Sequence, residues 1–213
     1  MRQLMIRTGE MLRDRRFLKK ALMIACPVAL QGMLNTVVNM VDTLMIGGLG
    51  SSAIAAVGLA NKYFFVFSLL VFGIVSGAGI LAAQYWGNGD VKSIRKVLGL
   101  SILLAAAGAL VFVLPGLIWP HQVMRIFTTS ESSIELGIKY LRIAVLTYPF
   151  IAMTNVYVAM LRAVNKVVYP VVCSCIAIAI NVVLNYVLIF GKFGAPQMGV
   201  AGAACATLIA RCI

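Results

Sequence analysis

The sequence predicts an all-α integral membrane protein, a bundle of six transmembrane helices. Of its 213 residues, 62% are hydrophobic and only 11% are charged, whereas about 25% of the residues in a soluble domain are charged. Apolar runs recur at the length of about 20 residues that carries a helix across a bilayer. These runs are continuous rather than alternating, which favours helices over a barrel of strands.

The first predicted span covers residues 18–46 and contains Pro27. A proline removes one backbone donor from a helix, so this position predicts a kink or a hinge. The span ends at the glycine-rich sequence of residues 47–50. The second predicted span covers 55–86. Its glycines predict a close approach by a neighbouring helix; they are Gly73, Gly77 and Gly79.

The remaining predicted spans cover residues 97–119, 138–161, 167–190 and 200–213. Pro120 closes the third span, and a more polar stretch separates it from the fourth. The last span has about 14 residues, fewer than the roughly 20 that a complete crossing needs. We therefore expect the sequence to stop inside a helix.

The net charge is +12, which in a soluble protein would suggest a nucleic-acid partner. Here the basic residues lie between the predicted helices and alternate from loop to loop, so we interpret them as determinants of topology and expect no nucleic acid. One side holds Arg2, Arg7, Arg13, Arg15, Arg16, Lys19, Lys20, Lys92, Arg95, Lys96, Arg162 and Lys166. The positive-inside rule then places the N-terminus in the cytoplasm. We expect a multi-pass protein of the plasma (inner) membrane.

Asp42 is the only acidic residue in the apolar stretch from about Ala21 to Leu59. A carboxylate inside a membrane costs about 2.5–3.5 kcal/mol on insertion scales, so it predicts a partner or a function. Three polar residues precede it at steps of four, four and three, which place all four on one helix face; they are Gln31, Asn35 and Asn39. Such a stripe predicts an interior cavity rather than contact with lipid.

The fifth predicted span carries a second polar group. Asn181 and Asn185 are one helical turn apart, and Ser174 lies seven residues before Asn181 on roughly the same face. These amides and the hydroxyl supply neutral oxygen ligands and hydrogen-bond donors. Alone they are equally typical of hydrogen bonding between helices. Together with Asp42 they predict a site for a cation or a proton.

Motifs of enzymes are absent from the sequence. It has no G-x-x-x-x-G-K-[ST] nucleotide loop, and Ser76 and Ser174 have no histidine or lysine nearby in sequence that would serve as a base. The five cysteines match no zinc-site spacing, and we interpret them as packing residues. We therefore expect no enzyme and no cofactor.

Several motifs carry a family resemblance. They are PVALQ at 27–31, VDTLMIG at 41–47, ILAAQYWG at 80–87, INVVLNYVLIFG at 180–191 and GVAGAA at 199–204. Together they resemble the MATE family of multidrug and toxic compound extrusion transporters. That family has twelve helices in two six-helix lobes related by a pseudo-twofold axis along the membrane normal. The resemblance implies that this chain is the N-terminal lobe and that a C-terminal lobe is missing from it.

The resemblance also implies a function, the exchange of a drug-like and often cationic substrate for H⁺ or Na⁺. Pro27 matches the family's first-helix proline, which is linked to bending. Asp42 matches its coupling acid and Asn181 its fifth-helix asparagine. One common family pattern has an aspartate four residues later, where this chain has Asn185. Sodium would then rely on one carboxylate and neutral oxygens, to which Thr207 could contribute. Two further residues could line the cavity: Tyr140 and Asn155.

Two alternatives remain open from the sequence. A flippase for lipid-linked precursors or a polysaccharide exporter of the same superfamily would share the helical plan. It would need several basic residues within the membrane, but Lys62, Arg142 and Arg211 could each reach the interface from the end of a span. A non-transporting membrane scaffold is the second alternative. Alternating access requires two halves around a shared cavity, so we expect one lobe alone not to transport.

Overall fold

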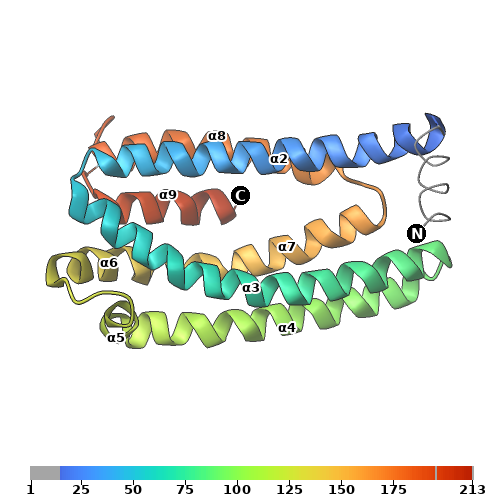
Figure 1. Cartoon of the computed structure of the whole chain (residues 1–213), viewed down its shortest axis with the longest axis horizontal. Helices are drawn as coiled ribbons and strands as arrows, with labels where there is room; N and C mark the ends of the chain where they lie inside the picture. Colours follow the sequence, from blue (N-terminus) through green and yellow to red (C-terminus); the bar gives the residue numbers. More distant parts are fainter. Residues whose placement is uncertain (1–14, 195, 213) are drawn as a thin grey trace, which may run out of the picture.

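The computed structural model describes residues 15–194 and 196–212, and the basic residues predicted before position 15 lie outside this range. The described chain folds into helices connected by short turns (Figure 1). They are α2 (Arg15–Gly47), α3 (Ser51–Gly87), α4 (Val91–Ile118), α5 (Pro120–Arg125), α6 (Glu131–Ala144), the 3₁₀ turn η1 (Val145–Thr147), α7 (Tyr148–Ala163), α8 (Val168–Phe190) and α9 (Val200–Cys212).

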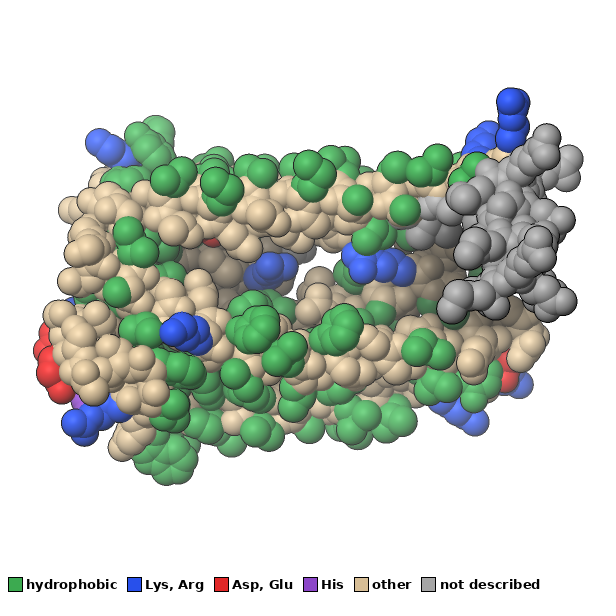
Figure 2. Space-filling view, viewed as in Figure 1, with side chains coloured by type: hydrophobic (Ala, Val, Ile, Leu, Met, Phe, Trp, Pro, Cys, Tyr) green, Lys and Arg blue, Asp and Glu red, His purple; other side chains and the backbone are tan. Residues whose placement is uncertain are grey.

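The structure confirms the prediction of an all-α membrane bundle. Four described segments are long and apolar enough to cross a bilayer: Ser51–Gly87, Val91–Ile118, Glu131–Ala163 and Val168–Phe190. The outer surface suits a lipid solvent, because large apolar side chains cover it (Figure 2). Leu44, for example, is 73% exposed and Phe72 is 69% exposed. The chain is therefore a multi-pass membrane protein.

α2 continues without a break through Pro27. Its 33 residues extend for about 50 Å at 1.5 Å per residue, which exceeds the roughly 30 Å thickness of the hydrocarbon core. Because Pro27 has no N–H, the carbonyl of Met23 one turn earlier lacks its helical partner. The role of Pro27 as a hinge stays a prediction.

The fourth predicted span is divided into α6, η1 and α7. The cause is Pro149, the second residue of α7, which cannot donate to the carbonyl of Val145 and so favours the tighter turn of η1. The Thr147 hydroxyl donates to the carbonyl of Ala144 over 2.6 Å within this turn. The apolar run crosses the break unchanged, which is why hydrophobicity alone predicted one helix there.

The helices form two layers (Figure 1). α2 packs against α8, and α8 packs against α9. The second layer holds α3, α4 and α7. α6 lies at one end of the bundle and contacts both α3 and α9, so it connects the layers.

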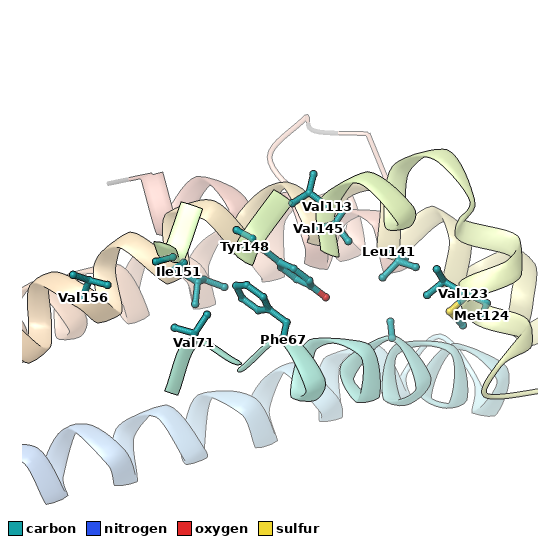
Figure 3. Packing of buried hydrophobic residues seen from close by; sticks show 14 of the residues in the cluster. Phe67, Val71, Val113, Val123, Met124, Leu141, Val145, Tyr148, Ile151 and Val156 are labelled. Carbon is teal, nitrogen blue, oxygen red and sulfur yellow. The ribbon is translucent and has the colours of Figure 1, made fainter. Parts of the chain in front are cut away.

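The larger hydrophobic core lies within the second layer, between α3, α4, α6 and α7. Phe67 of α3 and Tyr148 of α7 are both buried, and their rings stack at 4.4 Å between centroids with 13° between planes (Figure 3). A smaller core joins the α2–α3 turn and the start of α3 to α8 and α9; its buried residues are Ile46, Ala53, Val57, Ile189, Val200 and Ala203. This second core fixes α8 and α9 beside the end of α2.

The glycine prediction for the second span was wrong. A Cβ added at Gly73, Gly77 or Gly79 would meet no described atom within 4 Å. Among the described glycines, the closest approach to the backbone of another helix occurs at Gly202 of α9, where an added Cβ would lie 2.6 Å from the carbonyl oxygen of Leu188 in α8. Small residues at 201, 203 and 204 accompany it, so the tight helix pair is α8 with α9.

The turns between helices fall into two groups (Figure 1). The α3–α4 and α7–α8 turns lie at the end where α2 begins, and the α2–α3, α5–α6 and α8–α9 turns lie at the other. In the α3–α4 turn, Asp90 caps α4 by accepting hydrogen bonds from the hydroxyl and the amide of Ser93, over 2.6 and 3.0 Å. These bonds, the hydroxyl bond first, hold the pKa of the Asp90 carboxyl below its usual value.

Candidate functional site

Asp42 of α2 is bonded directly to α8. The side-chain amide of Asn185 donates to Asp42 Oδ1 over 2.6 Å. Asn185 is completely buried and Asp42 is half-buried. A short bond from a neutral amide to a carboxylate is charge-assisted, which makes it stronger than a bond between two neutral groups.

The network extends from α8 to α9. The same Asn185 amide donates to Asn181 Oδ1 over 3.1 Å, and the Asn181 amide donates to Thr207 Oγ1 over 3.4 Å. The Thr207 hydroxyl in turn donates to the carbonyl of Ala203 one turn earlier over 3.0 Å. The four residues that the sequence suggested for ion coupling therefore lie in one hydrogen-bonded chain across α2, α8 and α9. We name it the Asp42 network.

One oxygen in this network has no hydrogen-bond partner among the described residues. It is Asn185 Oδ1, which is buried. A buried acceptor that lacks a donor destabilises the folded protein by about 1–3 kcal/mol. A ligand that supplied positive charge or a proton to this oxygen would remove that penalty. Carbonyl and carboxylate oxygens are the donors that hard cations prefer. The set formed by Asp42, Asn185, Asn181 and Thr207 fits such a ligand by its chemistry.

Protonation would change the same bond. As a carboxylate, Asp42 only accepts hydrogen bonds, which matches the amide donor that it faces. As a neutral acid it gains one O–H donor, and the amide of Asn185 has a carbonyl oxygen free to accept it. The hydrogen bond between Asp42 and Asn185 therefore depends on whether Asp42 carries a charge.

A second polar cluster lies nearer the start of both helices. The Gln31 side-chain amide donates to Ser174 Oγ over 2.6 Å, and the guanidinium of Arg162 donates to Gln31 Oε1 over 3.0 Å. Gln31 is 8% exposed. We name this cluster the Gln31 tie; it joins α2, α8 and α7.

The sequence identified Gln31 as a cavity-lining residue but did not identify its partners. Arg162 was assigned to a loop, but it lies in the last turn of α7, where its side chain reaches α2. Ser174 was recognised as sharing a face with Asn181. The pairing of Ser174 with Gln31 could not be predicted, because it depends on the relative register of α2 and α8.

The other residues predicted to line a cavity are less closely connected. Asn35 and Asn39 of α2 and Asn155 of α7 are exposed. Tyr140 of α6 is half-buried and packs against both hydrophobic cores. Lining of a transport cavity by these residues stays a prediction.

The space between the two layers is hollowed, and Lys or Arg side chains lie in it (Figure 2). A separate apolar pocket of about 410 Å³ lies between α7 and α8, lined by residues that include Met153, Tyr157 and Tyr169. The residues of the Asp42 network do not line this pocket. This apolar pocket is therefore separate from the Asp42 network.

Comparison with known proteins gives a family match. The model of the MatE family matches residues 27–187, a range that includes Asp42 and both asparagines. The chain is 31% identical over 195 residues to "Probable multidrug resistance protein NorM" of Thermotoga maritima, which covers 91% of this chain and 42% of the relative. It is 30% identical to "Probable multidrug resistance protein YoeA" of Bacillus subtilis, with 86% and 40% covered. The chain thus spans about two fifths of the length of these relatives.

Solved structures show the same fold. An outward-facing multidrug resistance MATE family transporter of the MOP superfamily superimposes with a TM-score of 0.82 at 24% identity, over 91% of this chain and 42% of that one. A MATE structure in a bent conformation gives a TM-score of 0.79, also at 24% identity, over 91% of this chain and 43% of that one. The bundle described above therefore corresponds to one lobe of this architecture.

Proposed function

Because this chain belongs to the MatE family of transporters, we propose that it forms one lobe of a secondary-active multidrug efflux antiporter. The antiporter would export drug-like organic molecules, often cations, in exchange for H⁺ or Na⁺. Curated relatives named as multidrug resistance proteins support the substrate class. A transporter of this kind requires a second lobe, because alternating access moves two halves around one cavity.

The observation that carries the proposal is the Asp42 network. A membrane-embedded acid is expensive to retain unless it has a function, and here it faces an amide with a free buried oxygen. Asp42 could therefore exist in two states: a free carboxylate that accepts from Asn185, and a carboxyl group neutralised by a proton or a cation. Exchange requires such a pair of states, because a ligand shifts a conformational equilibrium only through its different affinity for the two conformations.

The network also suggests how the ion would act on the protein. Neutralising Asp42 weakens the charge-assisted bond that joins α2 to α8. A substrate cation would compete for the same negative charge. Ion binding and substrate binding would then exclude each other, which is the requirement for antiport. The proposed cellular location is the plasma (inner) membrane with the N-terminus in the cytoplasm.

The test is Asp42→Asn, expressed from the complete reading frame that encodes this chain. We expect normal insertion but loss of ion-driven efflux of ethidium, because an amide cannot exchange a proton or balance a cation. Thr43→Val is the matched control: Thr43 is exposed and its hydroxyl donates to the carbonyl of Asn39 within α2, over 2.7 Å. Efflux by a correctly inserted Asp42→Asn protein at the wild-type rate would refute the proposal.

The coupling ion is identified by a second measurement on the wild-type protein. Efflux is recorded in vesicles at fixed pH with and without a sodium gradient, and then with a proton gradient in sodium-free buffer. Acceleration by only one gradient identifies the driving ion. If neither gradient drives efflux, the antiport mechanism is wrong for this protein.

A further inference from the structure

Two hydrogen bonds join α2 to α8 at the same offset in sequence. Gln31 is 143 residues before Ser174, and Asp42 is 143 residues before Asn185. Each helix therefore advances by eleven residues between the two bonds, which is about three turns or 16 Å. Equal advance in the same direction means that α2 and α8 run parallel and in constant register between the two contacts.

The two contacts differ in what can change them. The bond at Asp42 depends on a group that can gain or lose charge. The Gln31 tie contains a neutral amide and a hydroxyl, and its third member is an arginine, which stays protonated in proteins. None of these three groups needs to change its charge when Asp42 does.

Burial makes the Gln31 tie costly to break. Gln31 is 8% exposed, and both ends of its amide have partners: the nitrogen donates to Ser174 and the oxygen accepts from Arg162. A buried amide that loses its partners keeps the full cost of desolvation. Because these partners lie on two other helices, α8 and α7, the tie fixes both the position and the rotation of α2 at this point.

Pro27 lies four residues, about one turn, before Gln31. The helix is weakest where the proline leaves a carbonyl without its donor. The Gln31 tie thus separates the weak turn from the ion site three turns further along α2.

We propose that Gln31 is a positioning residue for ion coupling. Held by Ser174 and Arg162, it pins the part of α2 that follows Pro27 to α8 and α7, so that Asp42 stays in register with Asn185. This inference rests on the proposed antiport function, and it assigns Gln31 no direct contact with ion or substrate.

The first test measures ion-driven ethidium efflux by variants of the complete transporter. Gln31→Leu removes both hydrogen bonds, and we expect the apparent KM for the driving ion to rise at least tenfold, because about tenfold already corresponds to the loss of one buried hydrogen bond. Gln31→Glu keeps an acceptor for Arg162 and for the Ser174 hydroxyl, and we expect it to restore the wild-type KM. Arg162→Gln should raise KM by less than Gln31→Leu.

Thr36→Val is the matched control. Thr36 lies in the same helix and is exposed, and its hydroxyl donates within α2 to the carbonyl of Gly32 over 3.0 Å. We expect this variant to keep the wild-type KM. A rise in KM equal to that of Gln31→Leu would show that any loss of a polar group from α2 has this effect, and would overturn the proposal.

The second test measures distances between paired spin labels. Met23 with Val172 reports on the segment before the tie, and Leu44 with Tyr186 reports on the ion site; all four side chains are exposed. In the wild type, we expect a narrow distribution of the Leu44–Tyr186 distance with and without the driving ion. In Gln31→Leu, we expect both distance distributions to broaden.

The two proposals fail in different ways. An unchanged Leu44–Tyr186 distribution and an unchanged KM in Gln31→Leu would refute the role of Gln31 while Asp42→Asn still abolishes efflux. Full activity of Asp42→Asn would refute the coupling site, whereas the label distances would still show whether Gln31 pins α2. Gln31→Glu and Arg162→Gln keep the test valid if Gln31→Leu fails to fold.

Discussion

At the scale of single residues, Asn185 is the centre of the candidate site. Its nitrogen donates twice, to Asp42 and to Asn181, and its oxygen is buried without a donor among the described residues. An aspartate at this position would offer two acceptors and no donor. The asparagine therefore donates to the Asp42 carboxylate and keeps one buried oxygen without a donor among the described residues.

We predict opposite effects for two substitutions at this residue. Asn185→Ala removes the donor and the free oxygen, and it should lower ion-driven ethidium efflux by at least tenfold, a loss of about 1.4 kcal/mol. Asn185→Asp places two carboxylates together, and like charges at such a distance cannot both remain ionised without a cation or a proton between them. It should retain transport and bind the driving ion more tightly, so that efflux saturates at a lower concentration of that ion.

The measurement is the efflux rate as a function of the driving-ion gradient, with Tyr186→Phe as the control. Tyr186 is the next residue of α8, is exposed, and packs on Phe190 at 5.8 Å between ring centroids. Equal gradient dependence of wild type and Asn185→Asp would argue against an ion site at this position.

The sequence predicted three members of the Asp42 network because their signals were local, whereas Thr207 was suggested only by the family resemblance. Asp42 was unusual in an apolar run, and Asn181 and Asn185 were one turn apart. Their joining by hydrogen bonds depends on how α2 and α8 pack. The partners of Gln31 could not be predicted for the same reason: Arg162 looked like an ordinary basic residue at the end of a span until α7 was seen to approach α2.

At the scale of elements, the pairing of α8 with α9 depends on Gly202. We predict that Gly202→Ala destabilises the lobe by about 1–3 kcal/mol, because its methyl group would lie 2.6 Å from the Leu188 carbonyl oxygen and backbone cannot move aside as a flexible side chain can. The measurement is thermal unfolding of the purified protein in detergent. The substitution should also disturb the hydrogen bond between Asn181 and Thr207, because Thr207 lies on α9.

Gly77→Ala is the matched control for this prediction. Gly77 is also a helical glycine, but an added Cβ there would meet no described atom within 4 Å. Alanine favours a helix over glycine by about 1 kcal/mol, so this variant should be neutral or slightly more stable. Equal destabilisation by both substitutions would show that the tight α8–α9 contact is not the cause.

The helices themselves were predictable because a bilayer imposes long apolar segments. The predicted span 55–86 corresponds to α3, Ser51–Gly87, and 167–190 corresponds to α8, Val168–Phe190. The predicted limits differ most where polar residues continue the helix into the interface, as at the start of α4, Val91–Ile118. The prediction of a close helix contact at the glycines of α3 was wrong because the sequence does not show which face of a helix has a neighbour.

At the scale of the whole molecule, the ends of the bundle differ in charge. Lys92, Arg95 and Lys96 adjoin the α3–α4 turn, and Lys166 lies in the α7–α8 turn, at the end where α2 begins (Figure 1). The opposite end carries acids beside its basic residues, among them Glu131 and Glu135. By the positive-inside rule, the first end should face the cytoplasm.

We predict the labelling pattern of single cysteines introduced into a cysteine-free variant. Cysteines at Asn88 and Asn165 should resist a membrane-impermeant maleimide added to intact cells, whereas cysteines at Thr129 and Phe193 should react. All four positions are exposed, so burial does not limit the reaction. Opening the membrane should make the first pair react as well. Labelling of Asn88→Cys in intact cells would reverse the assigned orientation.

The equal spacing of the two contacts between α2 and α8 also limits how this lobe can move. Sliding α2 along α8 by one residue, about 1.5 Å, would lengthen the bonds at Gln31 and at Asp42 together. Bending α2 before Gln31 would leave both bonds intact. Of the two common kinds of movement between packed elements, hinge and shear, this helix pair permits the hinge and resists the shear.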